Sequence, residues 1–136
     1  MRISAKAEYA CLAVIELARS GTNGTPRRVR EIAEAQGIPD RYLVHILLQL
    51  KVAGIVQSAR GSDGGYHLVR RAEDISVADI IQVIDGPADP LCRTDSPTAR
   101  ELLDLLKRAR VAQFDVLSSA TIAQFIRPNT IHDWVL

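Results

Sequence analysis

Residues 28–54 read RVREIAEAQGIPDRYLVHILLQLKVAG, and their pattern is the strongest indication of the type of fold. Apolar residues recur at helical spacing in its first part, which predicts a short helix over residues 28–36. Gly37 is expected to end this helix, because glycine readily adopts the left-handed conformation that often follows a helix. Pro39 then suits the start of a second helix over residues 40–53. Two short helices joined by a tight turn that contains glycine are typical of a helix-turn-helix.

The second helix of this pair has an apolar stripe made of Leu43, Ile46, Leu47 and Leu50. If that stripe faces the core, Arg41, Val44 and His45 lie on the outer face, in the half of the helix that enters the major groove. Arg41 can donate to guanine or phosphate, Val44 can contact a thymine methyl, and His45 can bond to a base edge. Tyr42 and Lys51 are candidate phosphate contacts, which position a protein on DNA without specifying sequence.

Two short runs of strand character follow, at residues 55–59 and 66–69, separated by RGSDGG at 60–65. Asp-Gly-Gly between such runs is a strong hairpin signal, because the turn needs backbone conformations that glycine adopts freely. A hairpin directly after a helix-turn-helix is a wing. The guanidinium of Arg60 can enter a narrow minor groove, and we group the wing glycines with it as candidate DNA contacts. These glycines are Gly61, Gly64 and Gly65.

Several arginines outside the second helix and the wing are further candidates for phosphate contacts. They are Arg27, Arg28, Arg30, Arg70 and Arg71. The alternative for any of them is an ordinary solvated surface charge. The glutamates at 8, 16, 31 and 34 are interpreted in that way, as solvated helix charges rather than acid–base pairs.

Three further helices are predicted around this centre. One spans residues 4–19 with Ser4 as its cap, and one begins at Ser76 with a capping-box pattern and ends at Asp85. The third spans 97–119 and carries apolar residues on more than one face. Because a surface helix needs only one apolar stripe, the extra stripe predicts a partner helix, most simply that of a second copy.

The predicted fold is mainly α with a small β-hairpin: a winged helix-turn-helix followed by a long C-terminal dimerisation helix. We divide the chain into a DNA-binding domain at 1–85, a sensor-type loop at 86–96, and a dimerisation helix with a tail at 97–136. The length of 136 residues suits one domain with such an arm. Residues 1–71 carry a net charge of +5 and residues 72–136 carry −4, so the basic half is the one expected to face nucleic acid.

The composition predicts a cytoplasmic protein. No apolar run approaches the length of a membrane span, and the first residues lack the apolar core of a signal peptide. The two cysteines, Cys11 and Cys92, make no disulfide framework. Cys11 is expected to be a buried, inert thiol of the first helix. Cys92 lies in a polar loop beside Arg93, which can favour the reactive thiolate, so it is a candidate redox sensor.

The residues show no pattern typical of a metal site or an enzyme. His45, His67 and His132 have no ligand spacing with one another or with the cysteines. No phosphate-binding loop, nucleophile elbow or catalytic dyad is recognisable, so an enzyme that uses Cys92 lacks both a base and an oxyanion motif.

The order of these motifs resembles the bacterial IscR/NsrR/CymR family of winged-helix regulators. The matching segments are MRISAKAEYA at 1–10, IAEAQGI at 32–38, Tyr42-Leu43, Leu50, GIV at 54–56, Arg60-Gly61, GGYHL at 64–68, DII at 79–81 and ATI at 120–122. The resemblance implies a homodimer held by the long C-terminal helix, with each unit on one half of a promoter palindrome. It also implies base reading by Arg41, Val44 and His45, with Arg60 in the minor groove.

The chain departs from the members of this family that bind an iron–sulfur cluster. Those members carry three cysteines in the region that here spans 86–105, where this chain has only Cys92. Glu8 stands where some members have a ligating glutamate, but Gln36 stands where their histidine aligns. A [2Fe–2S] cluster needs four ligands, so we expect none here. The chain resembles the cluster-free branch, whose signals are thiol chemistry, a small ligand or a partner protein.

The sequence predicts a DNA-binding transcriptional regulator that acts as a homodimer on a palindromic promoter site. We expect it to be a repressor. The glutamate that reads bases in some members is Val44 here, which predicts a different operator. The alternative is a winged-helix protein-interaction module, which the outward apolar Val44 and Leu48 favour and the basic first half disfavours. Salt distinguishes the two, because only phosphate binding weakens steeply as salt rises.

Overall fold

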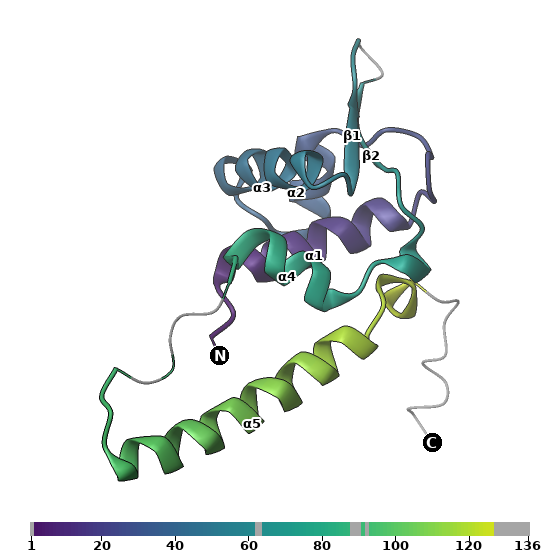
Figure 1. Ribbon diagram of the computed structural model, residues 1–136. Coiled ribbons are helices and arrows are strands. Elements are labelled where there is room, and N and C mark those ends of the chain that lie inside the picture. The colour runs from purple at the N-terminus through teal and green to yellow at the C-terminus, as the bar shows by residue number, and fades with distance from the viewer. Residues whose placement is uncertain (1, 62–63, 88–90, 92, 127–136) are drawn as a thin grey trace, which may run out of the picture.

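The computed structural model describes residues 2–61, 64–87, 91 and 93–126. Four helices and a two-stranded hairpin form a body, and a long fifth helix lies below α4 and extends beyond the body (Figure 1). In chain order the elements are α1 (Ala5–Ala18), α2 (Val29–Gln36), α3 (Asp40–Val52), β1 (Val56–Ala59), β2 (Gly65–Leu68), the 3-10 turn η1 (Ala72–Asp74), α4 (Val77–Asp85), α5 (Pro97–Ser119) and the 3-10 turn η2 (Ile122–Phe125).

The helix boundaries match the predicted ones to within a residue or two, because local caps set them. The Ser4 hydroxyl accepts a hydrogen bond from the backbone N–H of Ala7 at 3.0 Å. Ser76 and Asp79 form the predicted capping box, with reciprocal bonds of 2.9 and 3.0 Å. Gly37 follows α2 in the left-handed conformation, with φ of 67°. The predicted helix-turn-helix is therefore formed by α2 and α3.

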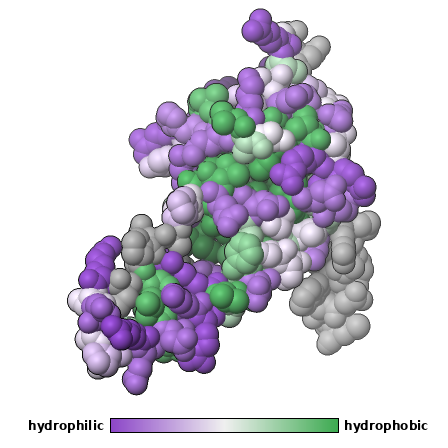
Figure 2. All heavy atoms as spheres, viewed as in Figure 1, coloured by the Kyte–Doolittle hydropathy of each residue, from purple (hydrophilic) through white to green (hydrophobic). Residues whose placement is uncertain are grey.

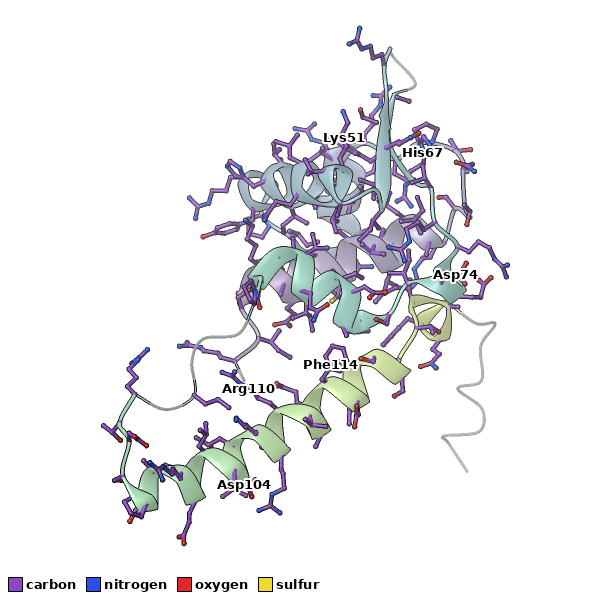
Figure 3. All side chains as sticks on the ribbon, in the orientation of Figure 1. Lys51, His67, Asp74, Asp104, Arg110 and Phe114 are labelled. Carbon is purple, nitrogen blue, oxygen red and sulfur yellow. The ribbon has the colours of Figure 1, made fainter. Side chains whose placement is uncertain are left out.

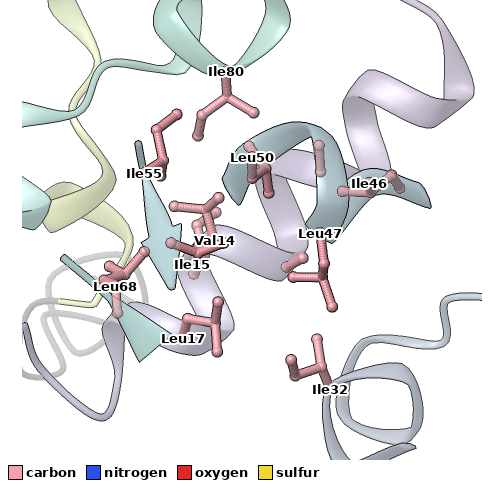
Figure 4. Close-up of a cluster of buried hydrophobic side chains, with 14 of the residues drawn as sticks. Val14, Ile15, Leu17, Ile32, Ile46, Leu47, Leu50, Ile55, Leu68 and Ile80 are labelled. Atoms are coloured by element: carbon pink, nitrogen blue, oxygen red, sulfur yellow. The ribbon is translucent and has the colours of Figure 1, made fainter. Parts of the chain in front are cut away.

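The core lies around α1, which crosses the middle of the body (Figure 4). The apolar stripe predicted for α3 is fully buried at Leu43, Ile46, Leu47 and Leu50. Ile32 of α2, Ile55, Leu68 and Ile80 close over the same cluster. Burial of these side chains fixes the rotation of α3, and the opposite face of α3 is consequently turned to solvent.

The wing is an antiparallel hairpin in which Val56 pairs with Leu68 and Ala59 pairs with Gly65. The segment before α2 lies along the second strand. The backbone N–H of Arg27 donates to Tyr66 O, and Tyr66 N–H donates to Arg27 O, both at 2.8 Å. The second strand of the wing is thus hydrogen-bonded to the residue that leads into the helix-turn-helix.

The long helix α5 contacts the body through α4, while most of its side chains remain exposed. Ala99 is its only buried residue among the side chains the structure describes there. The chain then returns, since Ile122 is fully buried and its N–H donates to Ile75 O at 2.9 Å. Ile122, just beyond α5, therefore belongs to the same core cluster as the elements of residues 1–85.

Candidate nucleic-acid interface

The outer face of α3 carries the side chains predicted to read bases. Val44 is 44% exposed, whereas its neighbour Leu43 is fully buried. Arg41 and His45 are exposed beside Val44. The first half of α3 therefore presents a guanidinium, an apolar side chain and an imidazole together, a set that can contact base edges in the major groove.

An aromatic stack supports the beginning of α3. The ring of Tyr42 lies 6.1 Å from the ring of Tyr9 on α1, centre to centre, with 27° between the planes. The guanidinium carbon of Arg41 lies 5.0 Å from the centre of the Tyr42 ring, a cation–π contact. Tyr42 remains 42% exposed, and its contact with a phosphate stays a prediction.

Lys51 connects the end of α3 to the wing. Its ammonium group donates a hydrogen bond of 2.9 Å to the hydroxyl of Ser58 on β1, and the side chain is exposed (Figure 3). A cation at this position lies between the two elements that are candidates for DNA contact. It can serve as a phosphate contact for either of them.

The wing places Arg60 just beyond the end of β1, with an exposed side chain. Gly61 has a φ of 98°, a left-handed conformation that favours glycine. Gly64 and Gly65 are required by close packing as well. An added Cβ would lie 2.4 Å from Ala59 O at Gly64 and 2.3 Å from Arg27 O at Gly65. The candidate glycines therefore shape the hairpin that presents Arg60.

The candidate phosphate arginines fall into different environments. Arg28 is exposed at the start of α2, where it can meet a phosphate. Arg27 instead turns inward, with its side chain 21% exposed, and pairs with Glu16 at 3.0 Å. Arg71 forms an exposed ion pair with Glu73 at 2.7 Å, and Arg70 donates to the Asp74 carbonyl at 3.1 Å. Arg27 is consequently a structural ion-pair partner in this fold.

Glu16 differs from the sequence interpretation, which treated it as a solvated helix charge. Its side chain is buried, because Arg27 and Gln36 cover it from outside α1. Both partners lie more than two helical turns away in sequence, so helical periodicity within α1 could not reveal them. The interpretation was wrong at this position, whereas Glu8, Glu31 and Glu34 are exposed as predicted.

Cys11 is half-buried in α1. Burial, followed by the negative charges of Asp85 and Glu8, raises the pKa of the Cys11 thiol to about 11. The thiol is therefore protonated at neutral pH, in agreement with the predicted inert side chain. Cys92, the candidate redox sensor, lies outside the described residues.

No helix in the described part of the chain is both long enough and apolar enough to span a bilayer. No group of three or more His, Cys, Asp or Glu side chains in that part is arranged to hold a metal ion.

A helix-turn-helix with an exposed reading face, followed by a glycine-shaped basic hairpin, defines a winged helix-turn-helix regulator. The model of the Rrf2 family, described as an iron-dependent transcriptional regulator, matches residues 3–128. This chain belongs to the Rrf2 family of DNA-binding transcriptional regulators. The predicted resemblance, fold class and regulatory function are confirmed, and the protein-interaction alternative is not favoured.

Individual relatives support the same assignment. The HTH-type transcriptional regulator Rv1287 of Mycobacterium tuberculosis is 39% identical over 130 residues, which cover 90% of this chain and 80% of the relative. IscR of Photobacterium profundum is 38% identical over 140 residues, which cover 98% and 80%. The solved structure of CymR, the global cysteine regulator of B. subtilis, has a TM-score of 0.79 at 34% identity, over 93% of this chain and 96% of CymR.

The family description mentions iron, but the donor set of this chain does not fit an iron–sulfur cluster. The 136 residues contain two cysteines, and a [2Fe–2S] cluster takes four protein ligands. The raised pKa of Cys11 further disfavours the thiolate form that a metal requires. Cys92 would be left as a single thiolate donor.

Proposed function

We propose that this regulator acts as a homodimer on a two-fold symmetric promoter site. The observation that carries the proposal is a second apolar stripe on α5, which we call the seam. Three of its members are strongly exposed: Leu102 at 50%, Leu105 at 53% and Val116 at 67%. A monomer would leave this row of side chains in water, and burial against another apolar surface would be favourable.

The seam has the spacing of a coiled-coil contact. Its members recur at alternating steps of three and four residues: Leu102, Leu105, Ala109, Ala112 and Val116. This is the repeat that keeps one stripe of a helix facing a partner helix over several turns. The two alanines in the middle allow close approach of the helix axes.

The body of the same chain does not compete for the seam. Figure 3 shows Arg110 and Phe114 pointing from α5 toward the body, with Asp104 on the far side of the helix. Leu103, Leu106 and Leu117, on the face toward the body, are half-buried. Apolar patches also interrupt the hydrophilic surface of α5 in the space-filling view (Figure 2). The simplest partner for the seam is the α5 helix of a second copy.

In this dimer each copy supplies one reading head, by which we mean α3 together with the wing. Arg41, Val44 and His45 would contact base edges in the major groove, and Arg60 would enter the adjacent minor groove. Two-fold symmetry would place the two α3 helices about 34 Å apart, one turn of DNA. Phosphate contacts from Arg28, Tyr42 and Lys51, and backbone contacts at the wing glycines Gly61, Gly64 and Gly65, would position each head.

A dimer across a promoter blocks polymerase, so we propose repression, in the bacterial cytoplasm, as the outcome of binding. The proposed regulatory signal does not involve an iron–sulfur cluster. It is thiol chemistry at Cys92, a small effector molecule or a partner protein. CymR, to which the chain is similar, is described as a global cysteine regulator. That description is consistent with regulation that needs no resident cluster.

Selection of binding sites from a random DNA library tests this proposal. The expected consensus is an inverted repeat whose half-sites lie about one helical turn apart. Light scattering on the complex should give two chains for each selected duplex. An asymmetric consensus bound by a single chain would refute the dimer, while enrichment of no sequence at all would refute base reading by α3.

A further inference from the structure

Glu16 is a buried carboxylate that DNA contact alone does not explain. At 8% exposed it is the one charged side chain in the buried set of the described residues. Carboxylates are almost never buried unless they are paired, because the loss of water strongly disfavours the charge. Its charge therefore needs partners within the fold.

Both carboxylate oxygens of Glu16 are occupied. Arg27 Nη1 donates to Oε2 at 3.0 Å, and Gln36 Nε2 donates to Oε1 at 2.7 Å. The half-exposed Arg19 approaches Oε1 at 3.5 Å. Burial alone would raise the pKa of Glu16, but the hydrogen bonds from Gln36 and Arg27 and the charges of Arg27 and Arg19 outweigh it and lower the pKa.

These partners belong to the two parts of the DNA-binding head. Gln36 is the last residue of α2, directly before the turn into α3. Arg27 is joined to β2 by its paired backbone hydrogen bonds with Tyr66, both 2.8 Å long. Gly65 packs so closely on the Arg27 carbonyl that an added Cβ would lie 2.3 Å from the oxygen. One carboxylate therefore bridges the helix-turn-helix and, through Arg27, the second strand of the wing.

We infer that Glu16 is a positioning residue for DNA binding, which holds the wing at a fixed orientation to α3 through Arg27. This inference rests on the proposed function, in which α3 and Arg60 contact the same DNA. The wing contact then depends on Glu16, although Glu16 does not touch DNA.

Glu16→Gln removes the charged arm of the bridge. One of the two terminal atoms of glutamine is a nitrogen that cannot accept, so the variant cannot accept from both Arg27 and Gln36 as the carboxylate does, and any hydrogen bond that it keeps with the Arg27 guanidinium has a neutral acceptor. Because this substitution also removes a negative charge, Glu34→Gln is the matched control: Glu34 is exposed on α2. Arg27→Lys is a second variant that keeps the charge and loses the forked geometry of the guanidinium.

The test is a double-mutant cycle with Arg60→Ala, measured as affinity for the selected DNA site. In the wild-type background Arg60→Ala should weaken binding about tenfold. Glu16→Gln and Arg27→Lys should each weaken binding by a similar factor, while Glu34→Gln stays within about twofold. In the Glu16→Gln background, Arg60→Ala should weaken DNA binding by a further factor of less than about three, because the wing contact is already lost.

A local readout separates positioning from general destabilisation. The backbone amides of Arg27 and Tyr66 should lose hydrogen-exchange protection in Glu16→Gln and Arg27→Lys, while the amide of the core residue Leu47 keeps its protection. A purely structural role would lower the protection of all three amides together.

The outcomes distinguish this inference from the proposed function. Glu16 does not position the wing if Arg60→Ala weakens DNA binding by the same factor in the wild-type and Glu16→Gln backgrounds. The same conclusion follows if the amides of Arg27, Tyr66 and Leu47 all lose protection together. If Arg60→Ala has no effect in the wild-type protein, the proposed wing contact itself is wrong, and the inference falls with it.

Discussion

At the scale of single residues, Glu8 and Glu16 show what the local pattern can convey. They lie eight positions apart on α1, and both were interpreted as solvated charges, yet only Glu16 is buried. The groups that cover Glu16 come from Arg27 and Gln36, which helical spacing within α1 does not involve. A buried ion pair formed across elements leaves no signature in the periodicity of one helix.

Cys11 gives a prediction at this scale. Its pKa is raised from 9.0 to about 11, so the reactive thiolate forms only in strongly alkaline solution. In a Cys92→Ser variant, alkylation of native Cys11 at pH 8 should be about a hundredfold slower than alkylation in denaturant. The native rate should keep rising as pH increases toward 11, and mass spectrometry of timed samples measures both rates. A native rate equal to the denatured rate would show that Cys11 is not shielded.

At the scale of elements, the helices were predictable because their ends are chemically local. Ser4, Gly37 and Ser76 act within a few residues of their own positions, and the caps form as expected. The hairpin also followed from its glycines. The strand-like pairing of Arg27 with Tyr66 was not predictable, because the loop before α2 contains turn residues and no strand pattern.

The wing provides a matched pair of glycine substitutions. Gly61 and Gly65 both have positive φ, but an added Cβ at Gly61 meets open space, whereas at Gly65 it meets the Arg27 carbonyl. Gly65→Ala should therefore reduce the free energy of unfolding by at least about 2 kcal/mol more than Gly61→Ala. Urea denaturation monitored by circular dichroism measures this difference in the free energy of unfolding. Equal losses would mean that the hairpin moves away from Arg27 at little cost.

The α5 seam provides a second matched pair. Leu105 and Val111 are similarly exposed, at 53% and 59%, but only Leu105 belongs to the seam. Leu105→Glu should convert the dimer to monomers at micromolar concentration, because two carboxylates would enter an apolar contact. Val111→Glu should leave the dimer intact. Sedimentation equilibrium of both variants measures the mass, and dissociation by Val111→Glu alone would place the interface on another face of α5.

At the scale of the whole molecule, charge separates the two halves of the chain. The net charge of residues 1–71 is +5, and three of their cations, Arg41, Lys51 and Arg60, lie on α3 and the wing. The −4 of residues 72–136 is not a charge of α5, because it includes Glu73, Asp74, Asp79 and Asp85 in η1 and α4 of the body. Positive charge is thus gathered on the face formed by α3 and the wing, which favours approach to DNA by that face.

This asymmetry predicts a steep dependence on salt. A dimer that neutralises about six phosphates should lose roughly a thousandfold in affinity between about 50 and 200 mM salt. Lys51→Ala should reduce the slope of log affinity against log salt by about two, one for each copy. The control is Lys107→Ala, an exposed position on α5, which should leave the slope unchanged. Filter binding at several salt concentrations gives the slopes, and a flat dependence would argue against phosphate contacts altogether.

The helix ends, the helix-turn-helix, the wing and the outward face of α3 could all be predicted from the amino-acid sequence. These features depend on residues within a few turns of one another, whose backbone preferences and apolar spacing act locally. In contrast, the inward pairing of Glu16 with Arg27 and the contribution of Ile122 to the core from beyond α5 are properties of the folded chain alone. Those contacts join segments distant in the chain, and they form because a buried charge or apolar side chain must find its partner wherever the packed fold supplies one.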